Sequence, residues 1–141
     1  MIRAHSAIKA MRDALAADSL LSQQASSGIY GHRFPAPPQE TQWCRVVVRE
    51  LLGAELDERS GFVLQPLQVS VQATGYDDID LLLAATHESI CRVLTGLMLD
   101  TSHGISLLPI ERTTRPGAAT YDEKTGSYAS ACLYLVPLTS Q

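Results

Sequence analysis

The fold is decided by residues 62–99, which read FVLQPLQVSVQATGYDDIDLLLAATHESICRVLTGLML. In the first part, apolar and polar residues alternate from Leu67 to Thr74. A period of two predicts a strand with one buried face and one wet or interfacial face, and Pro66 is a point at which this strand can bend. The second part has apolar residues at intervals of four and three. It predicts an amphipathic helix that begins at a capping Asp77 or Asp78 and runs to about Leu99.

The segments before this stretch alternate between helix, loop and strand signals. Apolar residues four, three and four apart predict a helix from about Arg3 to Ala17, and Asp18 is placed to cap a further short turn. Residues 31–42 hold three prolines among polar residues, which predicts an extended loop. Trp43 to Val48 is a β-branched and aromatic run typical of a strand, and residues 53–61 then form a charged loop.

The segments after this stretch are predicted to be strands. Ile105 to Thr113 is interrupted by Pro109, which favours an edge or bulged strand, and Tyr121 to Val136 is typical of a hairpin. The order helix, strands, helix, strands predicts an α+β fold. We expect a mixed or antiparallel sheet of four to five strands with two main helices packed on one face. A length of 141 residues fits a single domain over residues 1–141.

Composition excludes several classes of protein. The net charge of −4 argues against broad binding to nucleic-acid phosphates, which requires clustered Lys and Arg, and no sequence-specific nucleic-acid binding is expected. The three cysteines, Cys44, Cys91 and Cys132, are odd in number and widely spaced, so we expect a reducing compartment and no disulfide framework. The sequence shows neither a signal-peptide core nor an apolar run long enough for a membrane span, and no membrane partner is expected.

The sequence lacks the common catalytic signatures for nucleophile elbows, phosphate-binding loops, dinucleotide-binding turns and zinc proteases. His87 and Cys91 lie four residues apart on the predicted helix and could share a metal with His103 or Cys132. A helical histidine and a buried cysteine are the simpler interpretation. The acids at positions 77, 78 and 80 are interpreted as a helix cap and partners of the helix dipole rather than a cation site. We therefore expect no catalytic residue, no metal and no cofactor, and keep a small metal-dependent enzyme as an alternative.

A series of short motifs resembles the tail-terminator and tail-completion proteins of long-tailed phages. The motifs are Leu15-Ala16-Ala17-Asp18, then Leu21, then Gly28-Ile29-Tyr30, then the prolines, and then Val46-Val47-Val48. In that family a first helix ends in a similar Leu-Ala-x-Asp, a Gly/Arg-Ile-Tyr segment follows, and a proline loop enters the first long strand. The polar-alternating strand, the helix at 78–99 and the hairpin at about 121–136 follow in the same order. The resemblance covers nearly the whole chain.

The resemblance implies a structural virion protein rather than an enzyme. Such proteins sit as homo-hexameric rings on the head-proximal end of the phage tail tube. There they end tube polymerisation and provide the surface that joins the head. The implied partners are further copies of the chain, the tail-tube protein and the head–tail connector protein, and DNA can pass through the ring. The implied location is the virion tail, after synthesis in the host cytoplasm. Another neck or head-completion connector protein is the nearest alternative.

Charged and polar residues are the predicted contacts between subunits. A closed ring requires a heterologous contact, in which one patch meets a different patch on the next copy. The polar strand face and the two loops at 51–61 and 113–126 offer such patches, with a solvated face as the alternative for the charges. The predicted set is Arg45, Arg49, Glu55, Asp57, Glu58, Arg59, Gln68, Ser70, Gln72, Arg112 and Arg115.

Overall fold

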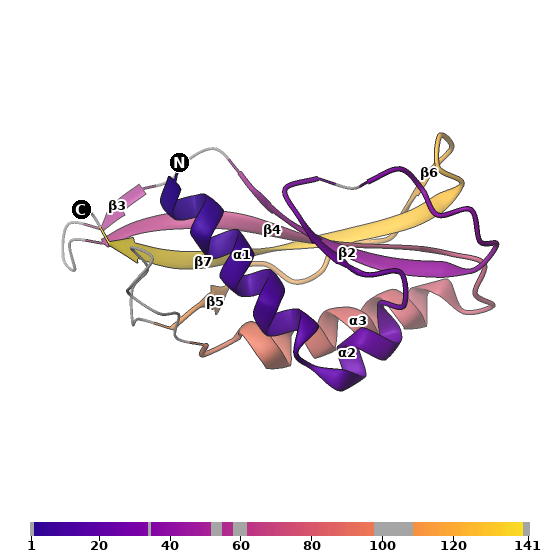
Figure 1. Ribbon diagram of the computed structural model, residues 1–141, viewed down its shortest axis with the longest axis horizontal. Coiled ribbons are helices and arrows are strands. Elements are labelled where there is room, and N and C mark those ends of the chain that lie inside the picture. Colours follow the sequence, from indigo (N-terminus) through magenta and orange to yellow (C-terminus); the bar gives the residue numbers. More distant parts are fainter. Residues whose placement is uncertain (1, 34, 52–54, 58–61, 98–108, 140–141) are drawn as a thin grey trace.

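The computed structural model describes residues 2–33, 35–51, 55–57, 62–97 and 109–139 (Figure 1). Its elements in chain order are α1 (Ile2–Ala16), α2 (Ser19–Gln24), β1 (Ile29–Gly31), β2 (Trp43–Glu50), β3 (Glu55–Asp57), β4 (Phe62–Thr74), α3 (Ile79–Leu94), β5 (Glu111–Arg112), β6 (Thr120–Asp122) and β7 (Ser127–Thr139). The predicted α+β class is therefore confirmed. Among the described helices, none is both long enough and apolar enough to cross a membrane.

The strands form one mixed sheet. Its main path is β1-β2-β4-β7-β5, and the short strands β3 and β6 pair with β4 and β7, which gives seven strands in all. β1 runs parallel to β2, and every other described pair is antiparallel. The predicted strands correspond to β2, β4, β5, β6 and β7, and the short strands β1 and β3 were not predicted. β4 and β7 are the spine of the sheet, because they pair from Phe62↔Thr139 to Ala73↔Tyr128.

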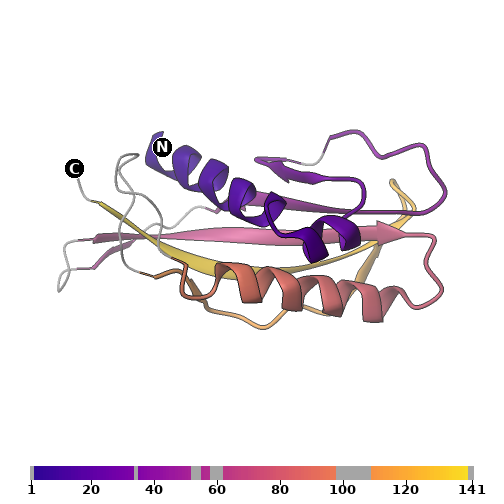
Figure 2. The same cartoon turned by 60° about the horizontal axis from the view of Figure 1, so that its bottom comes forward.

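The two long helices lie on one face of this sheet (Figures 1 and 2). The alternation of β4 explains why, because Leu67, Val69, Val71 and Ala73 are completely buried and belong to the same apolar core as the helices. The neighbouring strands continue this face in register, as in the row Val48, Val69 and Cys132. Burial of apolar surface, at about 25 cal/mol per Å², is the main stabilising term of this layer. The helix residues of the core are Ala7, Ile8, Met11, Leu15, Leu21, Leu83, Ile90 and Leu94.

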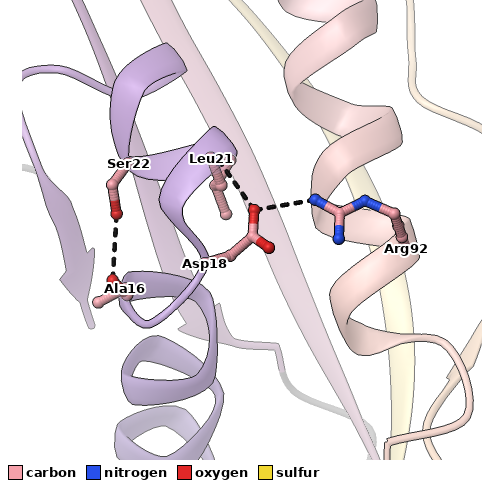
Figure 3. A network of polar contacts seen from close by, with 5 residues as sticks. All are labelled: Ala16, Asp18, Leu21, Ser22 and Arg92. Carbon is pink, nitrogen blue, oxygen red and sulfur yellow. Dashed lines mark hydrogen bonds and ion pairs between the residues drawn. The ribbon is translucent and has the colours of Figure 1, made fainter.

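Both predicted helix caps are confirmed. The Leu21 amide donates to Asp18 Oδ2 (2.9 Å) at the start of α2, and the Leu81 amide donates to Asp78 Oδ1 (3.1 Å) at the start of α3. The Asp18 carboxylate also accepts a hydrogen bond from Arg92 of α3 at 2.9 Å, so it ties α2 to α3 (Figure 3). A side-chain oxygen that bonds a free amide of the first turn is the usual function of an N-cap residue.

The predicted end of α3 at Leu99 is wrong, because the helix ends at Leu94. Gly96 has a positive φ of 81°, which takes the backbone out of the helix. Its amide donates to the Ile110 carbonyl (3.1 Å), and the Ile110 amide donates to the Leu97 carbonyl (3.0 Å). The chain after the helix therefore bonds to the segment that leads into β5.

Several predicted boundaries differ from the structure in smaller ways. β3 lies within the stretch predicted as a charged loop at 53–61, and of the strand predicted at 105–113 only β5 is seen, with 105–108 outside the described residues. The strand predicted around Pro66 is confirmed as β4, and Pro66 lies within it. Its carbonyl accepts the Leu51 amide (3.2 Å), just past the end of β2. Proline has no amide hydrogen to donate back to the Leu51 carbonyl, and Gln65 Nε2 donates to that carbonyl instead (2.8 Å).

Candidate assembly surfaces

The sheet face that points away from the helices carries a buried arginine. Arg45 is 1% exposed, and its guanidinium lies 4.9 Å from the Trp43 ring centroid. Its Nε donates to Gln72 Oε1 (2.8 Å), and its Nη1 donates to the carbonyls of Pro35 (3.0 Å) and Ala36 (3.1 Å). Burial lowers the pKa of Arg45, but arginine stays charged at any ordinary pH. A buried charge is tolerated only with such partners, so Arg45 holds the proline loop against the sheet.

The neighbours of Arg45 on this face are also engaged within the chain. Gln72 is 4% exposed and Ser70 is 6% exposed. Gln72 Nε2 donates to Thr125 Oγ1 (3.3 Å) in the turn between β6 and β7. Arg45, Ser70 and Gln72 were predicted as subunit contacts, but all three present almost no surface, and Arg45 and Gln72 bind loops of their own chain. This part of the predicted wet face is covered.

The polar face reaches solvent again where Arg49 faces Gln68 across β2 and β4. Arg49 is exposed, and its Nε donates to Gln68 Oε1 at 2.6 Å. The side chains of this pair remain accessible to a neighbouring molecule. A single exposed bond of this kind adds little to stability, at about 0–1 kcal/mol.

One edge of the sheet is acidic. We call residues 50–58 the acidic segment, because they contain four acids, Glu50, Glu55, Asp57 and Glu58, and no Lys or Arg. Its described part includes β3, which pairs with β4 opposite Phe62 to Leu64. β7 occupies the other side of β4 at those residues, so β3 lies on the same side as β2. Glu58 and the adjacent Arg59 lie outside the described residues.

The opposite edge is basic. We call residues 112–119 the basic strip, because they contain Arg112 and Arg115 and no acid. The strip lies along the outer edge of β7, since the Thr113 amide donates to the Leu133 carbonyl and the Gly117 amide to the Ala131 carbonyl, both at 2.9 Å. Arg112 and Arg115 are exposed, and neither makes a hydrogen bond or ion pair with any residue that the structure describes. Their charges are available to a partner.

A cleft of about 480 Å³ separates the basic strip from α3. Small side chains line most of its strip wall, and the helix contributes Asp80 and Glu88. A second cleft, of about 650 Å³, lies between α2 and α3 and shares Glu88 and Arg112 with the first. Both clefts therefore border the exposed side of α3. The strip wall of the first cleft is formed by Arg112, Arg115, Pro116, Gly117, Ala118 and Ala119.

His87 lies at the base of the first cleft, where it is 1% exposed. Its Nε2 lies 2.7 Å from Ser130 Oγ, and its Nδ1 lies 3.6 Å from Cys132 Sγ. Burial lowers the pKa of His87. The hydrogen bond that His87 Nε2 donates to the Ser130 carbonyl opposes this, and the charge of Arg112 adds to it. The imidazole is therefore neutral at pH 7, as suits a core residue.

This geometry gives little support to a metal or catalytic site. The two nitrogens of His87 face Ser130 and Cys132, whereas Cys91 contacts Thr95 Oγ1 at 3.1 Å. Among the described residues, no three His, Cys, Asp or Glu side chains are grouped so as to hold a metal ion. His103, the other predicted ligand, lies outside them. A serine next to a histidine suggests a nucleophile and base, but the second ring nitrogen here faces a thiol rather than an orienting carboxylate.

Comparison with known proteins shows a related fold. No protein-family model matches the sequence, and no curated protein sequence matches it significantly. Among solved structures, a chain from the virion of a native gene transfer agent (GTA) particle matches with a TM-score of 0.64 and 18% identity. The match covers 92% of this chain and 92% of that chain. At this identity the likeness shows the fold, which extends over nearly the whole of both chains.

Proposed function

We propose that this chain is a structural virion protein that caps the head-proximal end of a phage-type tail tube as a ring. In that position it ends polymerisation of the tube and provides the surface to which the head attaches. The observation that supports this most is the fold shared with a chain of the GTA virion over 92% of both lengths. The order of motifs that resembles tail terminators points in the same direction.

The surfaces of the chain suit a ring. A ring of identical subunits needs two different, complementary patches on each copy. Here β3, within the acidic segment, and the basic strip lie on opposite sides of the β4–β7 spine. We propose a homo-hexamer whose partners are the tail-tube protein and the head–tail connector protein, with DNA passing through the ring. The proposed location is the head-proximal end of the virion tail, after synthesis in the host cytoplasm.

Tube assembly in the presence of this protein tests the proposal. Purified tail-tube protein from the same particle is polymerised with increasing amounts of the chain, and tube lengths and end-bound rings are measured by electron microscopy. We expect shorter tubes and a ring at one end only. The control is Lys9→Ala, a change of one exposed charge on α1. Unaltered tube lengths with no end-bound protein would contradict the proposal, and binding to the connector without binding to tubes would reassign the chain to the neck.

A further inference from the structure

Within the described part of the chain, the basic strip is bonded on one side, along β7. Its inner backbone bonds to β7 through Thr113 and Gly117, and the Leu133 amide donates to Thr114 Oγ1 at 2.9 Å. Its two arginines are exposed and unpaired within the described part of the chain. Because the backbone of the strip is already fixed, its guanidinium groups can bind carboxylates with a small loss of conformational entropy.

The cleft beside the strip has room for an extended chain. Its volume is about 480 Å³, and the strip contributes Pro116, Gly117, Ala118 and Ala119 to its wall. Side chains this small let another backbone come close. An extended segment can approach a sheet edge in this way and add its own backbone hydrogen bonds.

The complementary charges lie on the other edge of the same sheet. The acidic segment carries four acids without a Lys or Arg, and the basic strip carries two arginines without an acid. β3 pairs on the β2 side of β4, whereas the strip lies on the outer side of β7. The two surfaces of one copy therefore face different neighbours, which is the arrangement that a heterologous contact requires.

From these observations we infer that the acidic segment of one copy binds in the cleft beside the basic strip of the next copy. The inference rests on the proposed function and specifies how the subunits of the ring meet. Glu55 and Asp57, at the two ends of β3, are the partners of Arg112 and Arg115. The like charges of Asp80 and Glu88 on the helix wall keep the incoming acids on the strip side.

Charge reversal tests the contact directly. We compare full-length wild-type protein with a strip variant, Arg112→Glu with Arg115→Glu, and an edge variant, Glu55→Arg with Asp57→Arg. The matched control, Arg12→Glu with Arg33→Glu, changes the net charge as much as the strip variant does. Light scattering over a concentration series measures association. We expect each contact variant to weaken association at least about tenfold, while the control matches wild type.

Mixing the two contact variants tests whether complementary charges on strip and edge are enough to restore association. The strip variant has two acids on its strip, and the edge variant has two arginines on its edge, so these two altered surfaces have opposite charges. The unaltered strip of the edge variant and the unaltered edge of the strip variant form the wild-type pair. We expect mixed oligomers to form where neither variant associates alone. A mixture that stays monomeric would overturn the inference.

Glu88→Gln tests the sign of the charge that enters the cleft. If the incoming segment is acidic, removal of the Glu88 carboxylate relieves repulsion and tightens association by about two- to fivefold. If a basic segment entered instead, the same change would weaken association, and the inference would be overturned.

Zero-length crosslinking tests the contact even when association is weak. The chain has only two lysines, Lys9 and Lys124, so Arg115→Lys adds a third lysine, whose amine carbodiimide can join to a nearby carboxylate. Isotopically mixed chains identify links between copies by mass spectrometry. We expect links from position 115 to the acidic segment. Links between copies that avoid this segment, or none at all, would overturn the inference. The tube-capping experiment is separate, so its success would leave the proposed function in place.

Discussion

The Asp18 oxygen that caps α2 is the same oxygen that binds Arg92 of α3. Oδ2 accepts the Leu21 amide and the Arg92 guanidinium, each at 2.9 Å (Figure 3). The hydrogen bond from Arg92 lowers the pKa of Asp18, with the Leu21 amide as the next contribution. A carboxylate with a lowered folded pKa stabilises the fold above its ordinary pKa of 3.8, and this stabilisation is lost as the pH falls towards the folded pKa.

Asp18→Asn separates the two functions of this carboxylate. Asparagine is as good an N-cap as aspartate, but it removes the charge that Arg92 binds. We expect a lower melting temperature at pH 7 and a smaller loss of stability on acidification below pH 4 than in wild type. Thermal unfolding followed by circular dichroism measures both. The control is Asp13→Asn, which removes an exposed carboxylate whose ion pair with Arg12 is longer, at 3.4 Å. An identical acid response in wild type and Asp18→Asn would contradict this assignment.

His87 is expected to make stability depend on pH in a higher range. Its folded pKa is lowered by burial, so the unfolded chain takes up protons first as the pH falls below the ordinary value of 6.5. Stability is therefore complete above that value and declines below it, down to the folded pKa. His87→Gln should reduce this slope between pH 7 and pH 5, because glutamine does not titrate. Urea unfolding at several pH values measures the slope, and His32→Gln, a change at an exposed histidine, is the control.

Arg45 is expected to hold the proline loop in place. Arg45→Leu leaves the carbonyls of Pro35 and Ala36 and the Gln72 amide without this donor. Of these partners Gln72 is buried, and an unsatisfied buried group costs about 1–3 kcal/mol, so we expect a loss of about that size in the free energy of unfolding. Hydrogen exchange should rise at residues 35–42 before it rises in β4. Arg49→Leu, on the exposed side of the same strand, should change stability by less than about 1 kcal/mol. Equal losses of stability in the two variants would contradict the assignment of Arg45 as the residue that holds the proline loop.

Gly75 and Gly96 form a matched pair for testing backbone packing. Both have positive φ, 85° and 81°. A Cβ at Gly75 would lie 2.1 Å from the Thr41 carbonyl oxygen, whereas one at Gly96 would meet nothing within 4 Å. Alanine at Gly96 carries only the conformational cost, about 1–2 kcal/mol. Alanine at Gly75 adds a clash with backbone, so we expect a further loss of at least about 2 kcal/mol. Urea unfolding of the two variants measures the difference, and equal losses would contradict the close approach.

The sequence predicted the layers of this fold well, because periodicity reports burial directly. The alternation from Leu67 to Ala73 identified the core face of β4, and the aspartates at 18 and 78 identified two helix starts. The end of α3 was not predictable in the same way. Leu97 continues the helical spacing, but the backbone leaves the helix because Gly96 bonds to Ile110, a contact between segments far apart in sequence.

The candidate surfaces were predicted in part. The sequence identified the charged residues but could not show which of them are already used. Only Arg45 gave a hint that it is buried, because it lies among β-branched residues. A buried charge needs a polar partner, and Gln72 on the neighbouring strand is that partner. Nothing local indicated that Asp18 meets Arg92, or that Arg112 and Arg115 line a cleft with α3. These relationships depend on how the helices pack over the sheet.

The spine formed by β4 and β7 has a mechanical consequence. The two strands stay in register from Phe62↔Thr139 to Ala73↔Tyr128, and this ladder spans about 40 Å at the usual rise per residue. A force along the strands loads all its hydrogen bonds in shear at once, whereas a force across them would open one rung at a time. The molecule is therefore stiffest along its longest axis. A force applied at the turn between β6 and β7 is transmitted to the Phe62↔Thr139 end of the ladder with little change in its length.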